Sequence, residues 1–77
     1  MTVIQKVMNL VSWIVDIPIN RICPTTNFRE DLLLDHIDFS IMIIKLEAFF
    51  NVSLSVSEVS RIETVKDASY LINRYIG

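Results

Sequence analysis

Seventy-seven residues, 52% of them hydrophobic, suffice for one small domain spanning residues 1–77 and are too few for two. The net charge of −2 argues against a nucleic-acid-binding protein, which would present a basic face. The single cysteine, Cys23, excludes an internal disulfide, and we expect a buried or half-buried thiol in a reducing cytoplasm.

The beginning of the chain lacks the basic region and the small-residue cleavage site of a signal peptide. No apolar run approaches the roughly 18 residues that span a bilayer. We therefore expect a cytoplasmic protein that does not insert into membranes. Between residues 30 and 47 five acids face one lysine, and this locally acidic stretch predicts a basic partner surface.

An amphipathic helix of about four turns is predicted at the start of the chain. Its apolar side chains recur at helical spacing, and its polar ones fall on the other side. Thr2 is its expected N-cap, and Pro18 is expected to end it. The apolar face consists of Val3, Val7, Met8, Val11 and Ile14.

Residues 16–34 form a long predicted loop that is interrupted by proline, asparagine and threonine. A loop of this length is unusual inside a compact domain. Because it carries apolar anchors of its own, we expect it to lie across the helices. These anchors are Ile17, Ile19, Ile22, Phe28, Leu32 and Leu34.

A second helix is predicted over residues 36–50, with two apolar stripes. The first stripe, assigned to the core, consists of Phe39, Met42, Ile43, Leu46 and Phe50. The second stripe consists of Ile37, Ile41, Ile44 and Ala48. A helix that is apolar nearly all round is either fully buried or contacts a partner, and both alternatives remain open at this point.

The remaining chain predicts two more helices. Residues 51–56 alternate between apolar and polar, and we interpret them as an extended link rather than an edge strand. Ser55 and Glu58 have the spacing of a capping box for a short helix over residues 57–62. Thr64 is expected to cap the last helix, which Gly77 closes and whose inner face is Val65, Ala68, Leu71, Ile72 and Tyr75. The predicted fold is an all-α four-helix bundle with one long crossover and a short third helix.

Any chemistry of this chain is expected where the loop meets the second helix, at Leu34-Asp35-His36-Ile37-Asp38. Asp35 can cap this helix, since its carboxylate can accept from unpaired backbone N–H groups. Asp38 in the first turn is favoured by the helix dipole. His36 would stand exposed at the helix start between two carboxylates.

The layout and several motifs resemble the acyl carrier protein family over nearly the whole chain. The family usually shows Phe-x-x-Asp-Leu-Gly, Asp-Ser-Leu-Asp, Leu-Glu-x-x-Phe and Ile-x-Thr-Val. This chain has Phe28-Arg29-Glu30-Asp31-Leu32, Asp35-His36-Ile37-Asp38, Leu46-Glu47-Ala48-Phe49-Phe50 and Ile62-Glu63-Thr64-Val65 at matching spacing. The resemblance implies a non-catalytic carrier of fatty-acid, polyketide or related thioester biosynthesis.

Two departures from the family pattern affect this expectation. The serine that carries 4′-phosphopantetheine in the family falls at His36, whose imidazole has no hydroxyl to form the phosphodiester. The chain is therefore expected to carry no arm and to be locked in the unmodified form. The family glycine falls at Leu33, which would rearrange the turn before the second helix.

Three interpretations of His36 stay open. It is an engineered serine replacement in an ordinary carrier, it marks a natural armless carrier that acts as an interaction module, or it does chemistry of its own. One imidazole with Asp35 and Asp38 is a poor metal set, and an acid–base role needs a substrate pocket. Ser40 as a substitute attachment site would move the hydroxyl by one helical turn, about 5–6 Å.

The resemblance also implies partners, namely a phosphopantetheinyl transferase and acyl-processing enzymes. They would dock on the second helix, on a face that we assign to Ile37, Ser40, Ile41, Ile44, Glu47 and Ala48. That contact would be more hydrophobic and less sensitive to salt than in more acidic carriers. A hypothesis of a different class is a helical interaction protein that uses the same helix. We expect a monomer, with weak self-association through this helix as the alternative.

Overall fold

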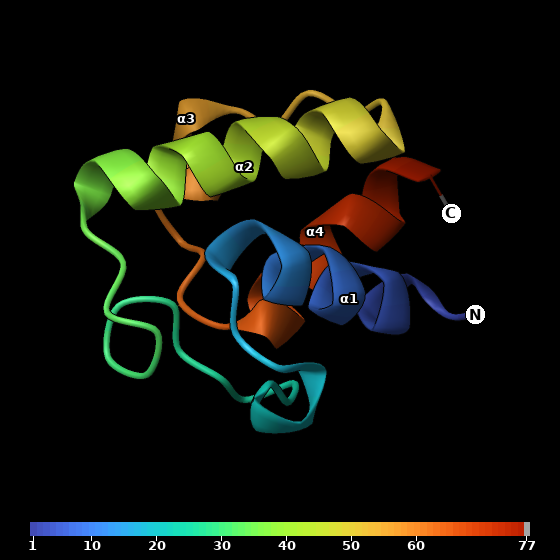
Figure 1. Cartoon of the computed structure of the whole chain (residues 1–77). Coiled ribbons are helices and arrows are strands. Elements are labelled where there is room, and N and C mark those ends of the chain that lie inside the picture. The colour runs from blue at the N-terminus through green and yellow to red at the C-terminus, as the bar shows by residue number, and fades with distance from the viewer. Residues whose placement is uncertain (77) are drawn as a thin grey trace.

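The computed structural model describes residues 1–76 as four α-helices and one short 3₁₀ helix (Figure 1). The elements are α1 (Val3–Val15), η1 (Ile19–Arg21), α2 (His36–Phe50), α3 (Val56–Val59) and α4 (Val65–Ile76). This confirms the all-α class, the long connection before the second helix and the short third helix. None of these helices is long and apolar enough to cross a membrane. Gly77, expected to close the last helix, lies outside the described residues.

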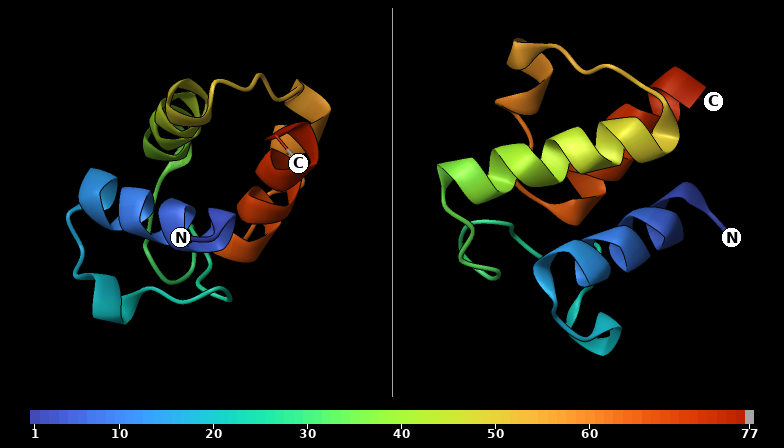
Figure 2. Two further views of the ribbon diagram at one scale, coloured as in Figure 1. Left: turned by 90° about the vertical axis from the view of Figure 1, so that its right-hand side faces the viewer. Right: turned by 45° about the horizontal axis from the view of Figure 1, so that its top comes forward.

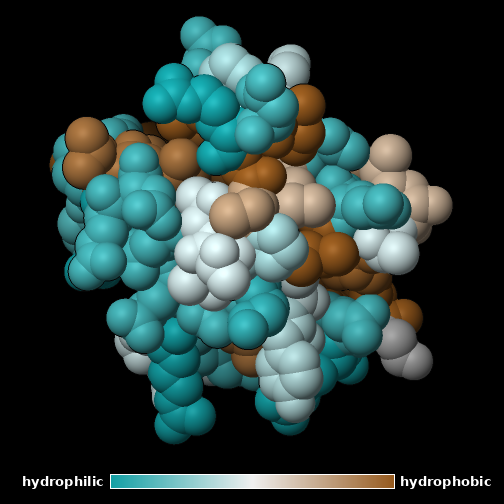
Figure 3. All heavy atoms as spheres, turned by 90° about the horizontal axis from the view of Figure 1, so that it is seen from below, coloured by the Kyte–Doolittle hydropathy of each residue, from teal (hydrophilic) through white to brown (hydrophobic). Residues whose placement is uncertain are grey.

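Helices α1 and α4 lie side by side, and α2 crosses one side of the molecule above them (Figures 1 and 2). The short α3 follows α2 through an extended link without β-strand pairing, as expected. The long loop closes the side opposite α2. From that opposite side hydrophilic side chains cover most of the surface, with apolar ones interspersed (Figure 3).

The core joins one face of each long helix to residues of the connecting segments. Val7 and Val11 of α1 are fully buried, as is Met42 of α2. Burial of each large aliphatic or aromatic side chain contributes on the order of 2 kcal/mol to folding. The other core residues are Ile22, Phe28, Phe39, Ile43, Leu46, Ile62, Val65, Ala68 and Ile72. The first stripe of α2 is thus core, as predicted, with Phe50 partly buried against it.

Helix α1 begins and ends by local hydrogen bonding. Thr2 and Gln5 form a reciprocal capping box, which confirms Thr2 as the N-cap. The helix ends at Val15 because Asp16 adopts a left-handed conformation, with φ 56° and ψ 48°. The expectation that Pro18 ends the helix was wrong, since the chain leaves the helix before reaching it.

The long loop is hydrogen bonded to the beginning of α4. The backbone carbonyls of Pro24 and Thr26 accept from the N–H groups of Lys66 and Val65, which have no partner within the helix. Phe28 donates to the carbonyl of Glu63 at 2.9 Å. The loop therefore lies across the helices as expected, and its apolar anchors pack inward except Ile19, which is 45% exposed in η1.

The last two helices begin at reciprocal caps. Ser55 and Glu58 form the predicted capping box, but α3 spans only Val56–Val59 and not residues 57–62. Thr64 and Asp67 exchange backbone-to-side-chain hydrogen bonds at the start of α4. Tyr75, assigned to the inner face of α4, is instead exposed, and its hydroxyl donates to Glu58 at 2.6 Å.

Candidate functional site at the start of α2

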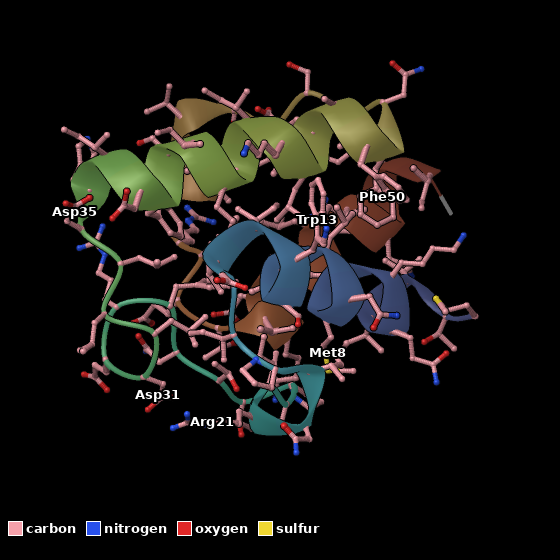
Figure 4. The ribbon with its side chains drawn as sticks, in the orientation of Figure 1. Met8, Trp13, Arg21, Asp31, Asp35 and Phe50 are labelled. Atoms are coloured by element: carbon pink, nitrogen blue, oxygen red, sulfur yellow. The ribbon has the colours of Figure 1, made fainter. Side chains whose placement is uncertain are left out.

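Helix α2 begins at His36, as predicted, and Asp35 is its N-cap. The Asp35 carboxylate accepts from the Asp38 N–H group at 2.8 Å, and Asp38 lies in the first turn. Both carboxylates are placed where the helix dipole favours negative charge. Figure 4 shows Asp35 at one end of α2 and Phe50 near the other. The Asp35 cap therefore makes His36 the first residue of α2.

His36 is exposed as the first residue of α2. Its imidazole lines a groove between α2 and the α3 segment, with a cavity volume of about 390 Å³. The groove is defined by Arg29, His36, Phe39, Ser40, Glu47, Leu54, Val56, Val59 and Ser60. Its polar side chains include His36 and Arg29, and aliphatic side chains from the link and α3 form one wall.

Two contacts hold the walls of this groove. Glu47 of α2 accepts the backbone N–H of Leu54 at 2.7 Å, which ties the link to the helix. The guanidinium carbon of Arg29 lies 5.7 Å from the centre of the Phe39 ring, within the range of a cation–π interaction. The groove is therefore a preformed space that can take an apolar group whose polar end lies near His36.

The six residues predicted to form the docking face fall into two groups. Ile37, Ile41, Ile44 and Ala48 are exposed. Ser40 and Glu47 are half-buried and line the groove instead. The six residues predicted to form one docking face therefore belong to two adjacent surfaces of α2.

Sequence reasoning missed the far wall of the groove. Leu54, Val56 and Val59 come from segments that follow α2, and Arg29 comes from the loop before it. The alternation of Leu54 and Val56 and the capping box at Ser55 and Glu58 were visible signals of an ordered apolar segment. The sequence did not indicate that this segment folds back against the start of α2.

Leu33 has a positive φ of 57° and is 80% exposed. This is the left-handed region, which glycine occupies without the steric cost that a Cβ atom brings. The turn before α2 thus has a backbone conformation suited to glycine, although leucine occupies the position.

Cys23 is exposed, so the expectation of a buried or half-buried thiol was wrong. The backbone N–H of Thr26 donates to the Cys23 carbonyl, and the Thr26 hydroxyl accepts the backbone N–H of Cys23. Residues 23–26 therefore form a turn with Pro24 at its second position. Thr26 is buried under this turn, and the thiol remains outside. Hydrogen bonds from the hydroxyls of Thr25 and then Thr26 lower the pKa of the thiol.

The described residues 1–76 hold no group of three histidine, cysteine, aspartate or glutamate side chains placed to bind a metal ion. His36 therefore lacks the additional ligands that a metal site with Asp35 and Asp38 would need.

Comparison with known proteins gives a consistent result over nearly the whole chain. A family model described as "Phosphopantetheine attachment site" matches residues 5–72. An acyl carrier protein of Phytoplasma australiense is 33% identical over 75 residues, which cover 97% of this chain and 99% of that protein. An acyl carrier protein of Phytoplasma mali is 30% identical over 74 residues, covering 96% and 88%. One from Thermosynechococcus vestitus is 28% identical over 75 residues, covering 97% and 93%.

Proposed function

Because the chain belongs to the acyl carrier protein family, we propose that residues 1–77 form one carrier domain of fatty-acid, polyketide or related thioester biosynthesis in the cytoplasm. Proteins of this family are carriers of a phosphopantetheine arm and not catalysts. The observation that carries the proposal is the start of α2. Asp35 caps the helix there, and the exposed first residue, His36, lines a largely apolar groove.

We assign His36 to the position at which the family attaches the arm. The Asp35 cap and the acidic first turn around it are intact, which favours a change confined to this one position. The residues present do not fit the arm, because the phosphodiester requires a hydroxyl oxygen and imidazole has only ring nitrogens. As its sequence stands, the chain remains in the unmodified form.

The groove and the exposed isoleucines of α2 complete the proposed site. The aliphatic wall of the groove suits part of an acyl chain. The outward side chains of Ile37, Ile41 and Ile44 suit a transferase or an acyl-processing enzyme. Since these side chains are uncharged, such docking depends on apolar contact more than on salt-sensitive charge.

A second candidate function is a natural armless carrier that acts as a helical interaction module. The observation that favours it is the exposure of large aliphatic side chains on α2: 68% for Ile37 and 63% for Ile44. In this case His36 needs no chemistry, and the partner contacts α2 directly.

Intact-mass spectrometry distinguishes the two candidates. The chain and its His36→Ser variant are incubated with coenzyme A and a phosphopantetheinyl transferase of broad specificity. The carrier proposal expects the mass of the arm on the serine variant only. His36→Ala is the matched control, and His36→Ser with Ser40→Ala shows whether the added serine is the acceptor.

Each result has a definite meaning. A folded His36→Ser variant that gains no mass overturns the carrier proposal and supports the armless module. A mass gain on the unchanged chain that Ser40→Ala abolishes makes Ser40 the acceptor and overturns the assignment of His36. Circular dichroism of every variant establishes that the helices are formed.

A further inference from the structure

Helix α2 has a second apolar side that its own domain does not cover. Phe39, Met42 and Leu46 point into the core, whereas Ile37, Ile41 and Ile44 are 68%, 44% and 63% exposed. Neither α1 nor α4 lies over this side of the helix (Figures 1 and 2). We name Ile37, Ile41, Ile44 and Ala48 the outer face of α2.

The outer face has the spacing of a coiled-coil contact. Its members follow one another at intervals of four, three and four residues. This is the heptad pattern, in which Ile37 and Ile44 occupy one core position and Ile41 and Ala48 the other. Side chains at such positions can pack between those of a facing α-helix.

The residues that flank the outer face indicate which helix it is. Asp38 and Lys45 lie along the same flank and carry opposite charges. When a second α2 runs antiparallel, Asp38 of each copy faces Lys45 of the other, and Ile41 packs beside Ile44 of the second copy. A parallel arrangement places Ser40 beside Lys45 and leaves Asp38 without an opposite charge.

We propose that a second copy of this chain covers the outer face of α2 in an antiparallel two-fold dimer. The arrangement is self-complementary, since each copy supplies both the acid and the lysine of the two symmetric pairs. Four side chains per copy bury much less than the roughly 800 Å² per partner of a stable interface. The dimer is therefore weak and forms only at high protein concentration.

Sedimentation equilibrium of the full chain from about 10 μM to 1 mM measures this association. The mean mass should rise toward that of a dimer across this range. Ile41→Gln should weaken association at least tenfold. Ile19→Gln is the matched control, because Ile19 is 45% exposed in η1 and Ile41 is 44% exposed in α2. It should leave the dimer unchanged.

Charge reversal tests the antiparallel orientation. Asp38→Lys and Lys45→Glu each place like charges opposite one another in the homodimer, and each should weaken it several-fold. The double variant restores both pairs and should restore association. A mixture of the two single variants should form a heterodimer more tightly than either variant forms a homodimer.

Several results overturn the proposal. A chain that stays monomeric at 1 mM leaves the outer face to another kind of partner. Association that Ile41→Gln and Ile19→Gln weaken equally arises elsewhere on the surface. Association that responds to Ile41→Gln but not to charge reversal excludes the antiparallel arrangement. Circular dichroism establishes that every variant retains the helices, so that a loss of association is not a loss of folding.

Discussion

The hydroxyl of Tyr75, near the end of α4, donates to Glu58 of α3 at 2.6 Å. The same Glu58 oxygen accepts the backbone N–H of Ser55 at 2.9 Å, as half of the capping box. One carboxylate therefore both begins α3 and attaches it to α4. Tyr75 thus makes a surface contact and is not part of the core.

Replacement of Tyr75 by phenylalanine tests this attachment. The hydrogen bond from Tyr75, and then that from Ser55, holds the pKa of Glu58 below its usual range. Tyr75→Phe should raise the pKa of Glu58 toward the usual value for glutamate. An NMR titration of the Glu58 side chain measures it, with Tyr70→Phe as the control on the same helix. An unchanged titration of Glu58 would show that Tyr75 does not bind it in solution.

Glu47 is expected to hold one wall of the groove. Glu47→Ala removes the acceptor for the Leu54 N–H and should lower the free energy of unfolding by about 1 kcal/mol. Glu47→Gln keeps an acceptor oxygen and should lose less than half of that. Urea unfolding measures both variants. If glutamine and alanine were equally destabilising, the charge of Glu47 and not its hydrogen bond would be responsible.

Leu33 occupies a backbone conformation that leucine adopts at a cost. Leu33→Gly should raise the free energy of unfolding by about 0.5–1 kcal/mol, because relief of the left-handed strain exceeds the added freedom of the unfolded chain. Little packing is lost, since the side chain is exposed. Leu33→Ala is the control, because it removes the side chain but keeps the Cβ atom. An equal gain for alanine would assign the effect to the exposed leucine surface.

Asp67 is expected to make the free energy of unfolding depend on pH in the acidic range. Burial alone would raise its pKa, but hydrogen bonds from the N–H groups of Glu63 and Thr64 outweigh burial and lower it. The stabilisation is thus complete above the usual aspartate pKa of about 3.9 and is lost as the pH falls through the lowered value.

Asp67→Asn should consequently be less stable than the parent at pH 7 by about 1 kcal/mol, with a difference that shrinks below about pH 4. Urea unfolding at pH 7, 4 and 3 measures it. A difference that stays constant with pH would mean that the neutral amide fails to cap α4 for steric reasons.

Local patterns predicted much of the fold. Thr2, Asp35, and Ser55 with Glu58 each marked a helix start, because the side chain of a capping residue accepts a backbone N–H two or three positions later. The helix ends were harder. Asp16 ends α1 by adopting a left-handed conformation, which the sequence signals less clearly than a proline. The turn of η1 rests on only three residues, too few for periodicity to reveal.

The site was predicted where it depends on neighbours in sequence and was missed where it depends on tertiary packing. His36 and its carboxylates follow from one helix start. The groove beside them requires the link and α3 to fold back along α2, an arrangement that no local spacing encodes. Cys23 was misplaced for a similar reason, since burial of Thr26 under the turn leaves the thiol outside.

Within residues 1–76, the long loop forms backbone hydrogen bonds with the start of α4 but not with α3. Among the described residues, backbone hydrogen bonds join the loop to the start of α4 across a long stretch of sequence, whereas those that join α2 and α3 to the rest of the chain run only to residues next to them in sequence. The region from His36 to Val59 can therefore open as a unit without breaking the backbone ladder that secures α4. Amide protons of α2 should exchange with solvent through such partial openings, while those at the start of α4 exchange only when the whole chain unfolds.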